Sequence, residues 1–159
     1  MNTLAAFHIT FLSIILTTNF DSANQLPKEM TLIPNGKFIA GKLGASKPIM
    51  LATFFIDKYE VTQVDYKQVT GNNPSYFKGE RRPVEKVNWF EANDYCEKIG
   101  KRLPTEWEWE KAAKAGTSTR YYWGNRMDDR FAWYKDNSNQ QTHPVGTTQP
   151  NSYGLYDMS

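Results

Sequence analysis

The side chains best suited to nucleophilic or metal chemistry are scarce in this chain of 159 residues, which has one cysteine and two histidines. Cys96 shares one face of a predicted helix with apolar residues, and a free cysteine in that setting behaves as a small hydrophobic residue. We therefore interpret Cys96 as a core residue, and a single cysteine excludes an internal disulfide. His143 precedes Pro144 in a predicted turn, and one imidazole without further spaced ligands does not make a zinc site.

Carboxylates available to a hard cation lie in the last third of the chain, at Asp128, Asp129 and Asp157. The alternating oxygen ligands and final glutamate of an EF-hand loop are absent, so we interpret these acids as solvated turn residues. Neither form of phosphate-binding glycine loop occurs in the sequence, and no serine lies in a Gly-x-Ser-x-Gly turn. The motifs therefore favour neither a nucleotide-binding enzyme nor a serine hydrolase.

The densest group of polar and aromatic side chains lies between Arg102 and Glu110. Thr105 can cap a helix with Glu108 at the reciprocal position, and acids in a first helical turn suit the helix dipole. Arg102 can bridge one of these acids and so lock the preceding loop to the helix. We assign no catalytic or cofactor-binding residue here, and interpret the segment as a structural motif made of Arg102, Thr105, Glu106, Glu108 and Trp109.

Three helices are predicted between residues 62 and 116, because capping residues and glycines alternate along this stretch. The pairs of capping residue and terminal glycine are Thr62 and Gly71, Asn88 and Gly100, and Thr105 and Gly116. Asp65 is the capping-box acid of the first helix. One face of the second helix carries Ala92, Tyr95, Cys96 and Ile99, and one face of the third carries Trp109, Ala112 and Ala113.

Strands are predicted before these helices. Short apolar runs on both sides of Pro34-Asn35-Gly36 predict a β-hairpin over residues 30–41, followed by a loop over residues 41–47. Strand character returns over residues 49–61, which are rich in aromatic and β-branched side chains. After Gly116 the pattern changes to aromatic clusters within polar loops, which can pack only through large rings and specific hydrogen bonds.

Composition bounds the function further. A chain of this length with 40% hydrophobic residues fits one globular domain. A net charge of +2 does not suggest a partner that is a nucleic acid, and the one dense basic segment, residues 78–82, includes its own acid.

The first residues differ from the rest of the chain. The apolar run from Leu4 to Leu16 is too short to span a bilayer comfortably and suits a secretory signal, although no lysine or arginine precedes it. We predict a signal peptide over residues 1–23, a linker over residues 24–29 and one domain over residues 30–159. The expected location is the periplasm, the cell envelope or the extracellular space. An uncleaved membrane anchor and a misassigned start codon are the alternatives.

Seven motifs in the same order resemble the sulfatase-modifying-factor family, also called formylglycine-generating enzymes. The motifs lie at residues 30–38, 57–62, 83–96, 102–110, 122–125, 144–146 and 150–158. The resemblance implies an irregular α+β fold related to C-type-lectin-like folds. It also implies a copper-dependent oxidase, which uses oxygen to convert a cysteine of a sulfatase to formylglycine. Other relatives of the family carry out non-haem-iron sulfur chemistry or serve in assembly of the bacterial envelope.

The sequence departs from the family pattern at its C-terminal side. After Met158 the family continues with a Gly-Asn-x-Trp-Glu-Trp segment and two copper-binding cysteines, so we expect this chain to be the N-terminal portion of the fold and inactive alone. The resemblance implies copper and calcium in complete members, but we expect no cofactor for this chain, and Asp136 and Asn137 are its weak calcium candidates. A sulfatase or another protein is the expected partner. The alternative is a non-catalytic envelope or protein-binding module.

Overall fold

The computed structural model describes residues 29–41 and 46–159, together with the backbone of residues 14–15. It confirms the expected α+β class. Most of the predicted signal peptide and linker, and part of the predicted loop over residues 41–47, lie outside the described residues. The elements are β1 (Ile14–Ile15), β2 (Met30–Ile33), β3 (Gly36–Ala40), β4 (Lys47–Leu51), β5 (Phe54–Asp57), α1 (Gln63–Thr70), α2 (Trp89–Lys98) and α3 (Glu106–Lys114).

The strands form two antiparallel sheets, one with the order β1-β5-β2 and the other made of β3 and β4. The predicted hairpin over residues 30–41 is therefore wrong, since β2 pairs with β5 and β3 pairs with β4. Pro34 and Asn35 carry the chain from one sheet to the other, and the same register continues across this bend, from Ile33 opposite Phe54 to Gly36 opposite Leu51. The two sheets are thus successive parts of one bent ribbon.

The bend has a local cause. Pro34 has no N–H to donate to a ladder, and the backbone N–H of Asn35 donates instead to the Thr53 hydroxyl, with an N–O distance of 3.1 Å. Gly36 then adopts a φ of 136°, which only glycine reaches without strain. The Pro-Asn-Gly sequence therefore marks a bend between the two sheets and not the hairpin turn that was predicted.

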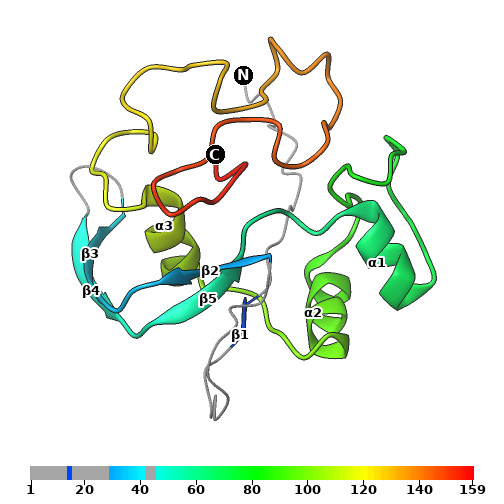
Figure 1. Ribbon diagram of the computed structural model, residues 1–159, viewed down its shortest axis with the longest axis horizontal. Helices are drawn as coiled ribbons and strands as arrows, with labels where there is room; N and C mark the ends of the chain where they lie inside the picture. Colours follow the sequence, from blue (N-terminus) through cyan, green and yellow to red (C-terminus); the bar gives the residue numbers. More distant parts are fainter. Residues whose placement is uncertain (1–13, 16–28, 42–45) are drawn as a thin grey trace, which may run out of the picture.

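Helices α1 and α2 pack together at one end of the molecule (Figure 1). In α1 the Thr62 side chain accepts from the backbone N–H of Asp65, and Gly71 ends the helix in the left-handed region with a φ of 78°. The Asp65 carboxylate accepts from the Thr62 hydroxyl rather than completing a capping box. In α2 a full capping box joins Asn88 and Glu91. Each helix thus begins at its predicted cap.

The first apolar core lies between α1, α2 and the segment that joins them. The rings of Tyr66 and Tyr95 stack with centroids 5.3 Å apart. Ile99 and Leu103 pack against this core from its edge. Its buried members are Val61, Tyr66, Val84, Val87, Ala92, Tyr95 and Cys96.

Helix α3 lies against the ribbon and helps to enclose a second core (Figure 1). Thr105 and Glu108 form its capping box. The helix ends at Lys114, two residues before the predicted Gly116, because Ala115 already takes a left-handed conformation with a φ of 46°. The second core contains Ile33, Phe54, Ile56, Ala112, Leu155 and Met158.

Loops make up the described chain after α3, and they run along one side of the molecule before the last residues return to α3 (Figure 1). The buried Asn151 fixes this return, since its amide donates to the carbonyl of Ala112 at 2.8 Å and its oxygen accepts from the N–H groups of Tyr153 and Leu155. Ser152 donates to the carbonyl of Ala115 at 2.7 Å. These bonds satisfy carbonyls that the end of a helix leaves without a partner.

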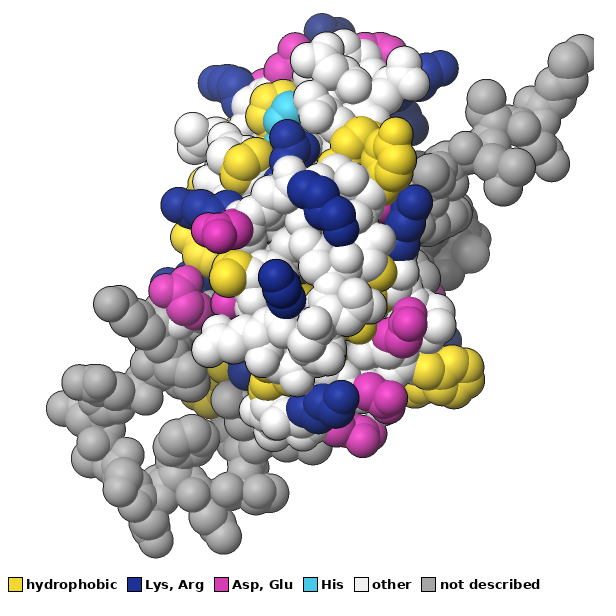
Figure 2. All heavy atoms as spheres, turned by 90° about the vertical axis from the view of Figure 1, so that its right-hand side faces the viewer, with side chains coloured by type: hydrophobic (Ala, Val, Ile, Leu, Met, Phe, Trp, Pro, Cys, Tyr) yellow, Lys and Arg dark blue, Asp and Glu magenta, His cyan; other side chains and the backbone are white. Residues whose placement is uncertain are grey.

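The surface formed by α1 and α2 has a mixed character. Figure 2 shows lysine and arginine side chains interspersed with acidic ones on this face, with hydrophobic side chains in separate small groups. No helix among the described residues is both long and apolar enough to cross a bilayer.

Candidate functional site: a pocket beside α3

The guanidinium of Arg102 holds the entrance to α3 through Glu108. Its two terminal nitrogens donate to the two carboxylate oxygens of Glu108 at 2.8 and 2.7 Å, and one of them also donates to the Leu103 carbonyl at 2.9 Å. Glu108 accepts further bonds from the backbone N–H and hydroxyl of Thr105 at 2.8 and 2.9 Å. Every strong donor around this carboxylate is therefore engaged in holding the loop to the helix.

The electrostatics of this pair follow from its contacts. Burial raises the pKa of Glu108, but the hydrogen bonds from Arg102 and Thr105 outweigh burial and bring the pKa below its ordinary value. The hydrogen bond to Glu108 in turn raises the pKa of Arg102. The pair is thus a fixed ion pair and has no proton to exchange near neutral pH.

The remaining members of the predicted motif lie apart from this ion pair. The side chain of Glu106 is exposed, and that of Trp109 is 40% exposed. Trp109 and Ala113, which were predicted to share a helix face, both line a pocket, whereas Ala112 on the same face is completely buried. The motif therefore contains a structural part, which is Arg102, Thr105 and Glu108, and one side chain that faces the pocket.

Two lysines that sequence reasoning did not single out fix α3 against the ribbon. Lys111 is buried and donates to the carbonyls of Pro34 and Gly36 at 2.6 and 3.1 Å. Lys114 donates to the carbonyls of Ile39 and Gly41 at 2.8 and 3.2 Å. Burial lowers the pKa of Lys111. No local pattern could have revealed these bonds, because the acceptors lie more than 70 residues earlier in the chain.

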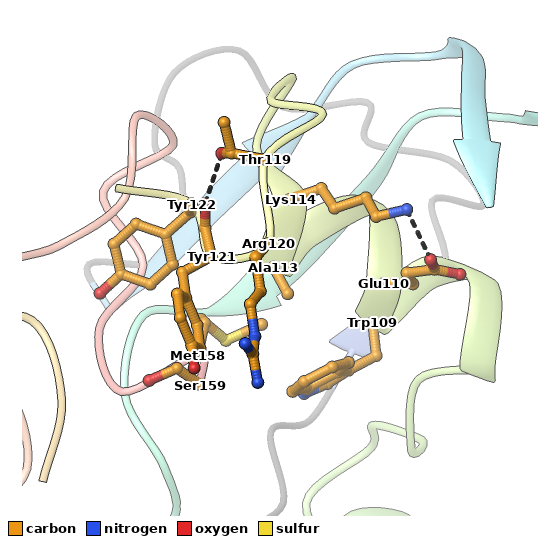
Figure 3. A pocket seen from close by; sticks show the side chains of 10 residues that line it. All are labelled: Trp109, Glu110, Ala113, Lys114, Thr119, Arg120, Tyr121, Tyr122, Met158 and Ser159. Atoms are coloured by element: carbon orange, nitrogen blue, oxygen red, sulfur yellow. Dashed lines mark hydrogen bonds and ion pairs between the residues drawn. The ribbon is translucent and has the colours of Figure 1, made fainter. Parts of the chain in front are cut away.

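Glu110 completes this contact. Its carboxylate accepts from the N–H of Gly41 and pairs with Lys114, with both distances 2.8 Å. A carboxylate and an ammonium group at the edge of the pocket thus neutralise each other. Figure 3 shows this pair on α3, directed away from the centre of the pocket.

The pocket has a volume of about 240 Å³ and lies between α3, the loop over residues 119–122 and the last described residues (Figure 3). Large rings and apolar side chains form most of its wall. Its lining consists of Trp109, Glu110, Ala113, Lys114, Thr119, Arg120, Tyr121, Tyr122, Met158 and Ser159.

Hydrogen bonds and ring contacts hold the aromatic wall in place. The Tyr122 hydroxyl donates to the Gln149 carbonyl at 2.8 Å, and burial raises the pKa of Tyr122 to about 12. The ring of Tyr121 stacks on Trp123 with centroids 4.7 Å apart. The guanidinium of Arg120 lies over the ring of Tyr121, 5.4 Å from its centroid. The wall is therefore positioned before any ligand arrives.

Cys96, which was predicted to be a core residue, and His143 both lie outside this pocket. Cys96 is 0% exposed in the first core, and burial raises its pKa to about 12. His143 stacks on Trp133 with ring centroids 3.8 Å apart, and its Nε2 atom lies 2.9 Å from the Ser138 carbonyl. A thiol this deeply buried is almost fully protonated at neutral pH, so the pocket offers binding groups rather than a sulfur nucleophile.

Comparison with known proteins decides the family. The sequence model described as "Sulfatase-modifying factor enzyme 1-like domain" matches residues 17–159. The chain belongs to this family. The resemblance seen in the seven motifs is thereby confirmed.

Proteins similar to this chain differ in length and name. The chain is 33% identical over 190 residues to the "Chaperone protein LppX" of Paenibacillus barcinonensis, and the match covers 82% of this chain and 68% of that protein. It is 32% identical over 112 residues to the formylglycine-generating enzyme of Mus musculus, and this match covers 62% of the chain and 30% of the enzyme. The chain thus spans about a third of the mouse enzyme's length.

A solved structure supports the fold. PvdO from Pseudomonas aeruginosa superimposes with a TM-score of 0.67 at 24% identity, over 81% of this chain and 66% of PvdO. At this identity the likeness concerns the fold alone.

The metal ligands that the family implies do not fit the side chains present. Copper held by two cysteines has no match in a chain whose one cysteine is buried in the first core. Of the calcium candidates, Asp136 is exposed, while Asn137 accepts from the N–H of Tyr134 at 2.7 Å and donates to the Ala132 carbonyl at 2.9 Å. Calcium takes six to eight oxygen ligands, and these two side chains do not approach that set.

The other acids considered as cation ligands are also engaged by the chain itself. Asp128 pairs with Arg130 at 2.6 Å, and hydrogen bonds from Arg130 lower the pKa of Asp128 to about 2. Asp157 accepts from the N–H of Gly146 at 2.8 Å and from the Thr148 hydroxyl at 2.9 Å. Among the described residues, no three histidine, cysteine or acidic side chains gather as a metal site would require.

Proposed function

We propose that this chain is a protein-binding member of the sulfatase-modifying-factor family, and that it holds a side chain of another polypeptide in the pocket beside α3. The observation that carries this proposal is the pocket itself, with a preformed aromatic wall and a partly exposed Trp109. Aromatic side chains supply large contact areas and are enriched where proteins bind one another.

The size of the pocket favours a side chain over a small-molecule cofactor. Small-molecule sites usually have volumes of about 300–1,000 Å³, and this pocket has about 240 Å³. A single large side chain therefore suits it better than a nucleotide or a flavin. Fixed walls also limit the conformational entropy that binding would cost.

The burial of Cys96 supports binding by this chain rather than oxidation by this chain alone. Thiolate ligation of copper requires ionised sulfur, and burial holds the only thiol, Cys96, in its protonated form. The carboxylate that lines the pocket, Glu110, is bound to Lys114 and Gly41. We accordingly propose that binding needs neither copper nor calcium, and that a chelator leaves it unchanged.

Binding can be measured on an array of octapeptides in which two central positions vary within a Gly-Ser background. Purified chain should bind a subset that carries a large apolar residue, and Trp109→Ala should abolish that binding. Phe90→Ala is the matched control, because Phe90 is 72% exposed on α2 and does not line the pocket. Equal binding by wild-type protein and Trp109→Ala would refute the proposed site.

A second candidate function follows from the names of the relatives. The mouse relative is a formylglycine-generating enzyme, so the chain could belong to a complex that acts on a sulfatase. The test is incubation with copper, oxygen and a cysteine-containing sulfatase peptide, followed by a hydrazide probe for aldehydes. We expect no aldehyde from this chain. Aldehyde formation that is lost in Cys96→Ala would replace the binding proposal with an oxidase.

The relative from Paenibacillus barcinonensis is named a chaperone, and chaperones act by binding other proteins, which agrees with the binding proposal.

We also propose that the apolar run from Leu4 to Leu16 directs export. Expression of the full chain followed by N-terminal sequencing of exported material tests this, with cleavage after Ala23 as the expected result. Full-length protein retained in the cytoplasm would contradict it.

A further inference from the structure

One cationic side chain of the pocket, Arg120, forms no ion pair with an acid of the described residues. Glu110 and Lys114 neutralise each other, but no ion pair within residues 29–41 and 46–159 includes the guanidinium of Arg120. Figure 3 shows the Arg120 side chain extending between Tyr121 and Trp109, and Arg120 is exposed. The pocket therefore has an apolar interior and a positive rim.

The contact with Tyr121 prepares Arg120 to bind an anion. A guanidinium that lies over an aromatic face keeps its N–H groups at its edge, where they match the two oxygens of a carboxylate. Less rotamer freedom is lost per hydrogen bond when the planar group is already positioned. An anion next to the pocket would thus meet a donor pair that is already oriented.

We propose that the partner segment carries an aspartate or glutamate beside the apolar residue that enters the pocket, and that Arg120 binds this carboxylate. This inference rests on the proposed binding function. It makes Arg120 a specificity-determining residue, while Trp109 and the aromatic wall supply the affinity.

The charges of the pocket favour a carboxylate over a phosphate. A phosphorylated side chain has a charge of about −1.5 to −2, so a single guanidinium balances only part of it. Lys114 cannot supply the second, since its ammonium group is bound to Glu110 and to two backbone carbonyls. The Glu110 carboxylate would also repel a dianion. One free guanidinium matches one carboxylate.

Two fluorescein-labelled octapeptides test the inference, one with Leu-Asp and one with Leu-Asn at the centre of a Gly-Ser background. The wild-type chain should bind the Leu-Asp peptide about fivefold more tightly by fluorescence anisotropy at low salt, as expected for an exposed charge-assisted pair. Salt at 0.5 M should remove most of that preference, because exposed charges are screened. Arg120→Gln should bind both peptides with the affinity of wild type for Leu-Asn.

Arg126→Gln is the matched control, since Arg126 is an exposed arginine of the same loop region that does not line the pocket. It should keep the full preference. Equal affinity of the wild-type chain for the two peptides overturns the role of Arg120 but leaves the proposed function standing. Tighter binding of a Leu-phosphoserine peptide also overturns it. If neither peptide binds wild-type protein better than it binds Trp109→Ala, the proposed function fails, and this inference fails with it.

Discussion

Helices α2 and α3 are similar in length and both begin with a capping box, yet they bury different kinds of side chain against the rest of the fold. Each starts with a capping box in which a side chain and a glutamate satisfy the first backbone N–H groups. Helix α2 then buries only Ala92, Tyr95 and Cys96, whereas α3 buries Glu108 and Lys111 beside Ala112.

The difference shows what each helix contacts. Helix α2 packs on α1, whose backbone groups are satisfied within the helix, and their contact includes apolar side chains and the stacked rings of Tyr66 and Tyr95. Helix α3 packs on the bend of the ribbon, where backbone carbonyls of Pro34, Gly36 and Ile39 accept from its lysines. Long lysine side chains reach these acceptors and also cover part of an edge that could otherwise pair with another chain.

This contrast also relates structure to binding. The bonds from Lys111 and Lys114 fix the face of α3 opposite the solvent, and they leave Trp109 directed toward the pocket. The pocket wall thus depends on charged contacts behind it, made by Lys111, and at its edge, made by Lys114.

The largest effect should come from the substitution Arg102→Ala. It leaves the carboxylate of Glu108, whose side chain is 11% exposed, without its cation. Loss of one partner of a buried pair destabilises by about 3–5 kcal/mol, and we expect about 3 kcal/mol here, since the Arg102 side chain is 29% exposed. Urea unfolding followed by circular dichroism measures this. A free energy of unfolding equal to that of wild type would show that Arg102 does not brace α3.

A smaller loss is expected from Lys111→Met, which keeps the length of the side chain but removes its two bonds to the ribbon. A hydrogen bond to a charged group contributes about 1.5–3 kcal/mol, and the ammonium no longer has to be buried, so we expect a net loss of about 2 kcal/mol. Lys98→Met in the last turn of α2 is the control, because Lys98 is exposed and should change stability by less than about 0.5 kcal/mol. Equal effects in the two helices would remove the contrast between them.

The sequence predicted those features that are encoded within a few residues. The caps at Thr62, Asn88 and Thr105 and the apolar face with Cys96 all depend on neighbours one turn away, and the structure has them where they were expected. The turn signal at residues 34–36 was misassigned because a bend and a hairpin use the same residues. Only the pairing partner distinguishes them, and β5 lies 20 residues further along the chain.

The candidate site was harder to predict. Trp109 was recognised within a motif, but its exposure depends on loops that contain no regular elements. The bonds of Lys111 and Asn151 join positions that are distant in sequence, and neither residue type indicates burial. The sequence does not indicate a role for Arg120, because an isolated arginine in a loop is ordinary. Its meaning comes from the absence of an ion pair to its guanidinium among the described residues.

In α2 the corresponding test is Cys96→Ala, which removes only a sulfur atom from the first core. The cavity left by one heavy atom should cost about 1 kcal/mol, less than either change to the contacts of α3. Native Cys96 should also resist a thiol reagent at pH 8, because burial raises its pKa to about 12. Rapid modification before unfolding in urea would show that the first core is more open than its packing indicates.

The smallest and most selective test uses pH. Contacts with Arg102 and Thr105 bring the pKa of Glu108 below its ordinary value despite burial, so the folded chain keeps this carboxylate ionised where the unfolded chain begins to take up protons. Its contribution to stability is complete above the unfolded pKa of about 4.3 and declines as the pH falls through the folded pKa. Glu108→Gln retains a capping side chain but has no such titration.

The free energies of unfolding of wild type and Glu108→Gln should therefore differ most at pH 6–7 and converge below about pH 4. The lowered pKa of Asp128 affects both proteins equally and cancels in the difference. Cys96→Ala provides the comparison from α2. Its difference from wild type in free energy of unfolding should stay constant over the same acid range, because the substitution removes no group that titrates in acid. A constant difference for Glu108→Gln as well would mean that the ionised form of Glu108 adds nothing to the stability of α3.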